Sequence, residues 1–153
     1  MMLRNEAGKF RDVSGELGPA FREPLASRGA AVGDLDGDGW PDLVVYRNGG
    51  EPRILRNQSV KGVHWLLVEL EGVKSNRDGI GAVVRVLAED GVEQTVTVSA
   101  TGGYLSAKDR RAHFGLGPNA RLKLIEIRWP SGVLQRLEDV PADQLLKIRE
   151  GAN

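Results

Sequence analysis

The segment DLDGDGWPD, at residues 34–42, constrains this chain more than any other stretch of it. Its four carboxylates belong to Asp34, Asp36, Asp38 and Asp42. Carboxylates spaced this closely repel one another unless a cation lies among them. All the donors are oxygens and no cysteine or histidine is nearby, so a hard cation such as Ca²⁺ suits the segment. The sequence therefore predicts a calcium-stabilised module.

The spacing assigns a ligand to alternate positions of this loop. The expected ligands are the backbone carbonyl of Trp40 and the side chains of Asp34, Asp36, Asp38 and Asp42. Gly39, at the sixth position, permits the sharp turn that brings both halves of the loop round the ion. The alternative is a turn rich in aspartate and glycine that binds nothing.

The flanks of the loop distinguish it from an EF-hand. An EF-hand carries a glutamate at position twelve and a helix on each side. Here position twelve is Val45, and the flanking runs at 30–33 and 43–46 are short, apolar and typical of strands. We therefore expect a loop between two strands, with a calcium affinity on the order of 10⁻⁴ M or weaker, as in extracellular modules.

Composition excludes several classes of function. Lys+Arg and Asp+Glu both number 21, so no net field attracts nucleic acid or an anionic membrane. Aromatic residues make up 5%, which argues against base-stacking platforms. The chain has no cysteine, which excludes disulfides, thiol catalysis and zinc-thiolate sites. No apolar run approaches the roughly 18 residues of a membrane span, and the first six residues do not form a signal peptide.

Two similar four-residue segments indicate an internal repeat. Met2–Asn5 reads MLRN and Ile54–Asn57 reads ILRN, about fifty residues later, a period typical of propeller blades and solenoids. A propeller needs about four or more blades to close, and residues 1–58 hold little more than one. We therefore expect the chain to be the C-terminal part of a longer propeller protein, or a shortened relative of one. Chance agreement over so few residues is the alternative.

The residue pattern of the second half predicts a succession of short strands. A polar joint at 58–63 predicts a domain boundary, with domains at 1–60 and 61–153. Seven strands are expected beyond it, at 64–70, 82–87, 93–98, 113–116, 122–129, 133–137 and 145–149. In the fifth of these, Ile125, Ile127 and Trp129 share one face. The predicted fold is all-β: a partial propeller-like calcium-loop repeat followed by an antiparallel β-sandwich.

Both halves resemble known families. Residues 28–57, with DLDGDGWPDLVV, resemble an FG-GAP repeat of the VCBS type, the calcium-carrying blade of integrin-like propellers. Residues 64–150 resemble the ASPIC/UnbV domain of the cartilage acidic protein-like family. The matching segments are SNRDGIGA at 75–82, GGYLS at 102–106, HFGLG at 113–117 and IRWPSG at 127–132. The resemblance implies the calcium ligands named above, an extracellular or periplasmic location and adhesion-like roles.

Two charged loops are the best candidates for a partner surface, because loops clustered at one end of a sandwich often bind ligands. They contain Asn76, Arg77, Asp78, Lys108, Arg110 and Arg111. An acidic glycan or a protein is the expected partner, and ordinary solvated loops are the alternative. The glycines at 79 and 81 predict a tight loop between strands rather than a phosphate cradle, because neither phosphate-binding pattern is present.

One cluster needs weighing for catalysis: Tyr104, Ser106, Asp109 and His113. Ser106 lacks the strand-to-helix elbow of a nucleophile, so we expect Tyr104 and His113 to satisfy backbone groups between sheets. The chain is therefore expected not to be an enzyme. The tryptophans at 40, 65 and 129 are expected to pack inside.

The predicted function is calcium-dependent extracellular recognition or adhesion. A purely structural, calcium-stapled capping domain and a carbohydrate-binding accessory domain of an enzyme remain the alternatives. Because a lone blade has open edges, we expect it to pack on the sandwich or to pair with another copy of the chain.

Overall fold

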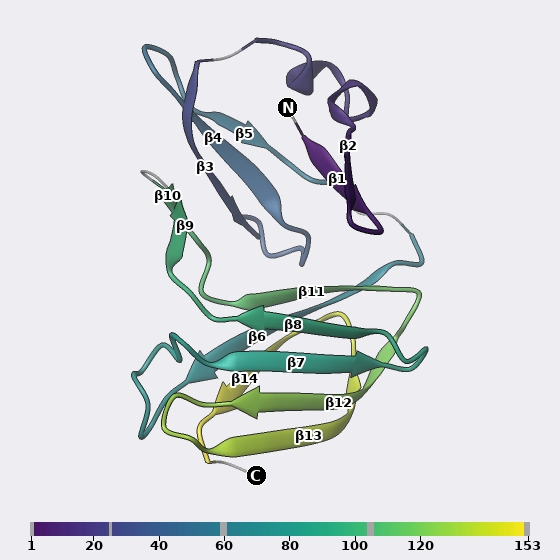
Figure 1. Cartoon of the computed structure of the whole chain (residues 1–153), viewed down its shortest axis with the longest axis vertical. Coiled ribbons are helices and arrows are strands. Elements are labelled where there is room, and N and C mark those ends of the chain that lie inside the picture. The colour runs from purple at the N-terminus through teal and green to yellow at the C-terminus, as the bar shows by residue number, and fades with distance from the viewer. Residues whose placement is uncertain (1, 25, 59–60, 104–105, 152–153) are drawn as a thin grey trace.

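The computed structural model describes residues 2–24, 26–58, 61–103 and 106–151, and its strands form two bodies along the long axis (Figure 1). The first body, called the repeat below, contains β1 to β5. The second, called the sandwich, contains β6 to β8 and β11 to β14. Within the described ranges the helical elements are two short 3₁₀ turns, η1 (Ser14–Glu16) and η2 (Pro19–Phe21). The all-β prediction is confirmed.

The repeat consists of a hairpin and a three-stranded antiparallel sheet. The hairpin joins β1 (Leu3–Glu6) to β2 (Lys9–Asp12), and the sheet has the order β3 (Ser27–Gly33), β4 (Asp42–Arg47), β5 (Arg53–Leu55). Gly33 lies opposite Asp42 in the register of β3 and β4. The aspartate-rich segment 34–42 therefore closes this hairpin, as the strand-like flanks predicted. We call it the ion loop.

The sandwich has seven strands in two sheets. One sheet has the order β11 (Ala112–Gly117), β6 (His64–Glu71), β14 (Gln144–Arg149). The other has the order β13 (Leu134–Pro141), β12 (Arg121–Arg128), β7 (Val83–Ala88), β8 (Glu93–Thr97). All seven predicted strands overlap these elements. The predicted division of the chain near residue 60 remains a prediction.

One pairing in the sandwich differs from the expected antiparallel pattern. β14 runs parallel to β6, with Leu146 opposite Val68. After β13, the chain crosses from one sheet to the other. There β14 pairs with one edge of β6, the first strand of the sandwich, and runs in the same direction. Alternation of apolar residues reports which face of a strand is buried, but not the direction of its neighbour.

The core lies between the two sheets of the sandwich. Ile125, Ile127 and Trp129 are at most 2% exposed, which confirms their predicted shared face. Leu122 is also fully buried, although it stands three residues before Ile125. The pairing of β12 with β7 shifts between Leu122 and Leu124. This irregularity restores the inward direction of Leu122, as a β-bulge does.

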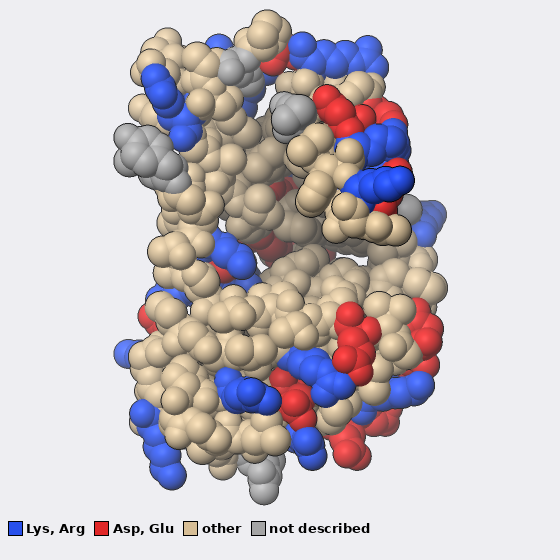
Figure 2. All heavy atoms as spheres, viewed as in Figure 1, with Lys and Arg blue, Asp and Glu red and all other residues tan. Residues whose placement is uncertain are grey.

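The outward face of the four-stranded sheet carries alternating charges. Arg85 on β7 pairs with Glu93 on β8 at 2.5 Å, and Arg136 on β13 pairs with Glu126 on β12 at 2.7 Å. Figure 2 shows positive and negative side chains interspersed over the sandwich on the face in view. Opposite charges across neighbouring strands support the pairing register.

A small hairpin extends from the sandwich toward the repeat. It consists of β9 (Thr101–Gly103) and β10 (Ser106–Ala107), and both strands contact β3 (Figure 1). The backbone N–H of Ala30 on β3 donates to Oγ of Ser106 at 3.1 Å. The residues at 104 and 105 lie outside the described ranges, and so does the predicted role of Tyr104.

Among the described residues, no helix has the length and apolar character needed to cross a membrane.

Candidate metal site

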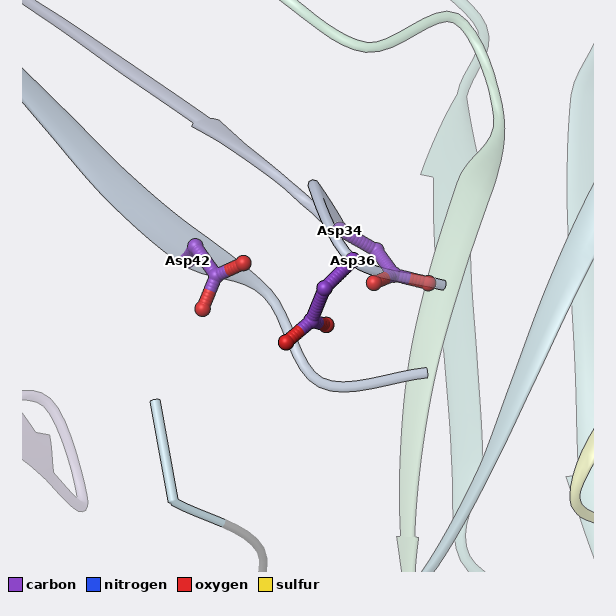
Figure 3. Close-up of side chains that lie close together, drawn as sticks. All are labelled: Asp34, Asp36 and Asp42. Carbon is purple, nitrogen blue, oxygen red and sulfur yellow. The ribbon is translucent and has the colours of Figure 1, made fainter. Parts of the chain in front are cut away.

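Three of the four predicted carboxylates gather at one point. One oxygen each from Asp34, Asp36 and Asp42 lies within 4.8 Å of the other two. Figure 3 shows Asp34 and Asp36 on the loop and Asp42 at the start of β4, with their carboxylates close together. Calcium–oxygen distances of 2.3–2.6 Å place ligands on opposite sides of an ion about 5 Å apart. The three oxygens are therefore donors of the kind that calcium prefers, at a spacing compatible with one shared ion.

Backbone hydrogen bonds fix Asp34. Its Oδ1 accepts the N–H groups of Gly37 at 2.8 Å and Asp38 at 3.1 Å, and its Oδ2 accepts the N–H of Gly39 at 3.0 Å. Aspartates commonly turn the chain in this way by bonding to the backbone a few residues on. The first carboxylate of the loop thereby organises the turn that brings Asp36 back beside it.

Asp42 joins the two ends of the loop to the segment that follows β5. Its Oδ2 accepts the N–H of Leu35 at 3.2 Å, and its Oδ1 accepts the N–H of Asn57 at 2.8 Å. The residue is 3% exposed. A buried carboxylate is costly unless it is hydrogen-bonded or bound to a cation, and Asp42 has the bonds as well as two carboxylate neighbours.

Asp38 and Arg56 depart from the expected pattern. Asp38 is not in the group of three; its Oδ1 accepts the N–H of Trp40 at 2.9 Å. Nε of Arg56 lies 2.7 Å from Oδ2 of Asp36, and Nη2 lies 3.6 Å from Oδ2 of Asp38. Sequence reasoning missed this arginine, although it stands in the repeated ILRN segment. The carbonyl of Trp40 remains a predicted ligand.

Gly39 is required at its position for two reasons. Its φ is +86°, a conformation that side chains disfavour. A Cβ at this residue would lie 1.8 Å from Cε2 of Trp65, so the loop backbone rests directly on the indole ring. Trp65 and Trp40 are only partly buried, in contrast to the prediction, whereas Trp129 lies in the core as expected.

Two side chains of the sandwich hold the loop backbone. Nε2 of His113 lies 2.9 Å from the carbonyl oxygen of Gly39. Nη2 of Arg111 donates to the carbonyl oxygen of Asp34 at 3.2 Å. Arg111 is itself fixed by Asp109, whose Oδ2 accepts from its Nη2 at 2.6 Å and from its Nε at 2.9 Å.

The Asp109–Arg111 pair is strongly charge-assisted. Burial works to raise the pKa of Asp109, but the hydrogen bonds and charge of Arg111 outweigh it, and the pKa lies below its usual range. The hydrogen bond to Asp109 correspondingly raises the pKa of Arg111. Both groups therefore stay charged at neutral pH.

The two predicted partner loops meet in space. Arg110 forms an ion pair with Asp78, which links the segment 108–111 to the segment 76–78. The side chain of Asn76 is used within its own loop, where it bonds to the N–H and the carbonyl of Ile80. Arg77 and Lys108 are exposed. Arg111 faces the ion loop instead, so this residue has a different environment from its neighbours.

The serine, aspartate and histidine weighed for catalysis have other contacts. Ser106 accepts from β3, His113 contacts Gly39, and Asp109 pairs with Arg111. The glycines at 79 and 81 both have positive φ, as the tight-loop interpretation predicted.

Comparison with known proteins finds one family match in the repeat and one in the part of the chain that contains the sandwich. The family described as ASPIC and UnbV matches residues 72–153, and the FG-GAP repeat matches residues 27–52, which include the whole ion loop. Cartilage acidic protein 1 of Xenopus tropicalis is 30% identical over 135 residues. This alignment covers 84% of the chain, whereas the chain spans only 20% of the length of that relative. The match to the ASPIC and UnbV family extends over more than half of this chain. The chain therefore belongs to the ASPIC and UnbV family.

Proposed function

We propose that this chain is a non-catalytic, calcium-binding recognition module of the extracellular or periplasmic space. One observation carries the proposal: carboxylate oxygens of Asp34, Asp36 and Asp42 lie within 4.8 Å of one another on a loop that matches an FG-GAP repeat. FG-GAP repeats are generally associated with calcium, and oxygen donors are the ligands that calcium prefers.

The expected affinity is weak. The loop has no glutamate at position twelve to supply two further oxygens, and Val45 stands there instead. Weak sites of this kind, with dissociation constants of about 10⁻⁴–10⁻³ M, are typical of extracellular modules. Within this proposal, calcium neutralises the three carboxylates and orders the loop between β3 and β4.

The recognition surface in this proposal is the pair of linked loops at 76–78 and 108–110. The Arg110–Asp78 ion pair holds them together, and Arg77 and Lys108 extend from them into solvent. A partner with negative charge, either a protein or a glycan, fits the two exposed cations. Binding of such a partner should weaken as the ionic strength rises.

The absence of catalysis is supported by the contacts of His113 and Ser106. Both side chains bond to backbone groups of the repeat, and Asp109 bonds to Arg111. A catalytic triad needs the imidazole to bond to both the nucleophile and the acid. A structural role for calcium alone is the second candidate, favoured by the burial of Asp42 at the start of β4 and by its bond to the N–H of Asn57.

Calorimetric titration with calcium tests the proposal directly. We expect saturable binding to the intact chain, a higher melting temperature in calcium than in chelator, and at least tenfold weaker binding in Asp36→Asn. Asp78→Asn is the matched control, because it removes one carboxylate that lies outside the ion loop. Equal binding by both variants, or no binding by the unmodified chain, would count against a calcium site. If the chain binds calcium but no partner binds to it on glycan arrays or in protein capture, the structural candidate is favoured.

A further inference from the structure

The ion loop contacts the sandwich at two points. Near its start, the carbonyl oxygen of Asp34 accepts a hydrogen bond from Arg111 at 3.2 Å. Near its far turn, the carbonyl oxygen of Gly39 lies 2.9 Å from Nε2 of His113. These residues are 77 and 74 positions apart in the chain, so the contacts are made only when the two bodies dock.

The sandwich presents these contacts from one rigid element. His113 lies on β11 and Trp65 on β6, and these two strands pair with His113 opposite Leu67 and Trp65 opposite Gly115. The indole of Trp65 lies against the backbone of Gly39. Arg111 immediately precedes β11 and is fixed by its two bonds to Asp109. Side chains fixed on a sheet hold a neighbouring loop more precisely than a flexible segment does.

Apolar packing contributes little to the contact on one side of the loop. A cavity of about 290 Å³ lies between β3 and the sandwich, with Val32, Pro41, Leu67 and Val96 among its lining residues. Atoms that face a cavity have no packing partner there. The two carbonyl hydrogen bonds and the Trp65 contact therefore hold the loop on the sandwich, together with the contacts that β9 and β10 make with β3.

We propose that Arg111 and His113 are positioning residues for the calcium loop, so that ion binding and docking of the repeat on the sandwich are coupled. This rests on the calcium-binding function proposed above. Without a cation, the three carboxylates repel one another and loosen the loop whose carbonyls the sandwich holds. Because such coupling is reciprocal, the sandwich tightens calcium binding and calcium tightens the docking of the repeat.

Calcium titration of Arg111→Gln and His113→Leu tests the coupling in the full chain. We expect about 5- to 30-fold weaker calcium binding in each, the usual range for coupled sites. Arg121→Gln is the control, since it removes an arginine of the sandwich that pairs with Asp139. His113→Gln should retain part of the affinity, because its amide N–H still reaches a carbonyl.

Hydrogen exchange in chelator gives a second readout that needs no ion. We expect faster exchange of the loop amides that Asp34 holds, at residues 37–39, in Arg111→Gln and His113→Leu than in Arg121→Gln. If the unmodified chain binds calcium and these variants bind equally well, the coupling is wrong while the calcium function stands. If the unmodified chain binds no calcium, the proposed function fails and the coupling fails with it. If His113→Leu does not fold, the calcium affinities and exchange rates of Arg111→Gln and His113→Gln test the coupling instead.

Discussion

Arg56 places a positive charge beside the ion loop. Its guanidinium lies 2.7 Å from Asp36, a predicted ligand, and 3.6 Å from Asp38. The side chain is 69% exposed and is therefore free to move into solvent. An arginine in this position offsets part of the repulsion among the carboxylates when no other cation is present, and it opposes an incoming calcium ion.

Removing this charge should tighten calcium binding. We expect Arg56→Gln to raise the calcium affinity about two- to fivefold, the size of an exposed charge interaction, and to lower the melting temperature in chelator. Arg53→Gln, three residues earlier, is the control, because Arg53 pairs with Glu23 at 2.6 Å instead. Titrations at low and high salt check the cause, since screening should shrink the difference. A weaker affinity in Arg56→Gln would mean that the arginine organises the site.

At the scale of elements, Glu150 connects the end of β14 to two loops of the sandwich. Its Oε2 accepts the N–H groups of Val73, Lys74 and Ser75, each at 2.7 Å. Its Oε1 accepts the hydroxyl of Ser75 at 2.9 Å and is also bonded to Ser131. Burial works to raise the pKa of Glu150, but these hydrogen bonds lower it from 4.5 to about 2.

This carboxylate should make the stability of the sandwich depend on pH. Because the folded pKa lies below the ordinary value, the ionised form stabilises the fold above about pH 4.5, and that contribution is lost as the pH falls toward 2. We expect Glu150→Gln to melt below the unmodified chain at pH 7 and the gap to narrow near pH 2.5. Glu138→Gln, which removes an exposed carboxylate from β13, is the control for thermal melting at both pH values. A constant gap would rule out ionisation of Glu150 as the cause.

Local sequence patterns predicted the individual strands, but they did not predict contacts between residues far apart in the chain. The alternation of Ile125 and Ile127 identified a strand because burial on one face imposes a period of two. The ion loop was predicted because its ligands are neighbours in sequence. His113 was expected to bond to a backbone group and Arg111 to belong to a partner surface, but their partners on the loop were not predicted, since these lie 74 and 77 residues away. The β9–β10 hairpin was likewise missed, because its contacts are with β3 of the other body.

For the whole molecule, stability is unevenly distributed. The buried core cluster lies in the sandwich. In the repeat, large apolar side chains remain exposed, among them Val32 at 53%, Tyr46 at 55% and Ile54 at 66%. The repeat therefore depends on the ion loop and on its contacts with the sandwich more than on a core of its own. The predicted pairing of its open edges with another copy of the chain stays a prediction.

The sandwich should need its last strand to fold. Ile148 of β14 is 4% exposed in the core, and β14 covers one edge of β6. We expect a chain of residues 62–153 to melt cooperatively and a chain of residues 62–142 to show no cooperative transition by circular dichroism. A cooperative transition in the shorter chain would show that β14 is dispensable.

The parallel pairing of β14 with β6 also sets the order of events during synthesis. The first strand of the sandwich leaves the ribosome long before the strand that pairs with its second edge, because 78 residues separate the partners Leu66 and Gln144. Contacts between such distant segments slow folding. The nascent sandwich therefore has one edge of β6 uncovered until β14 has been synthesised, and the ion loop gains its finished support only after β14 has paired with β6.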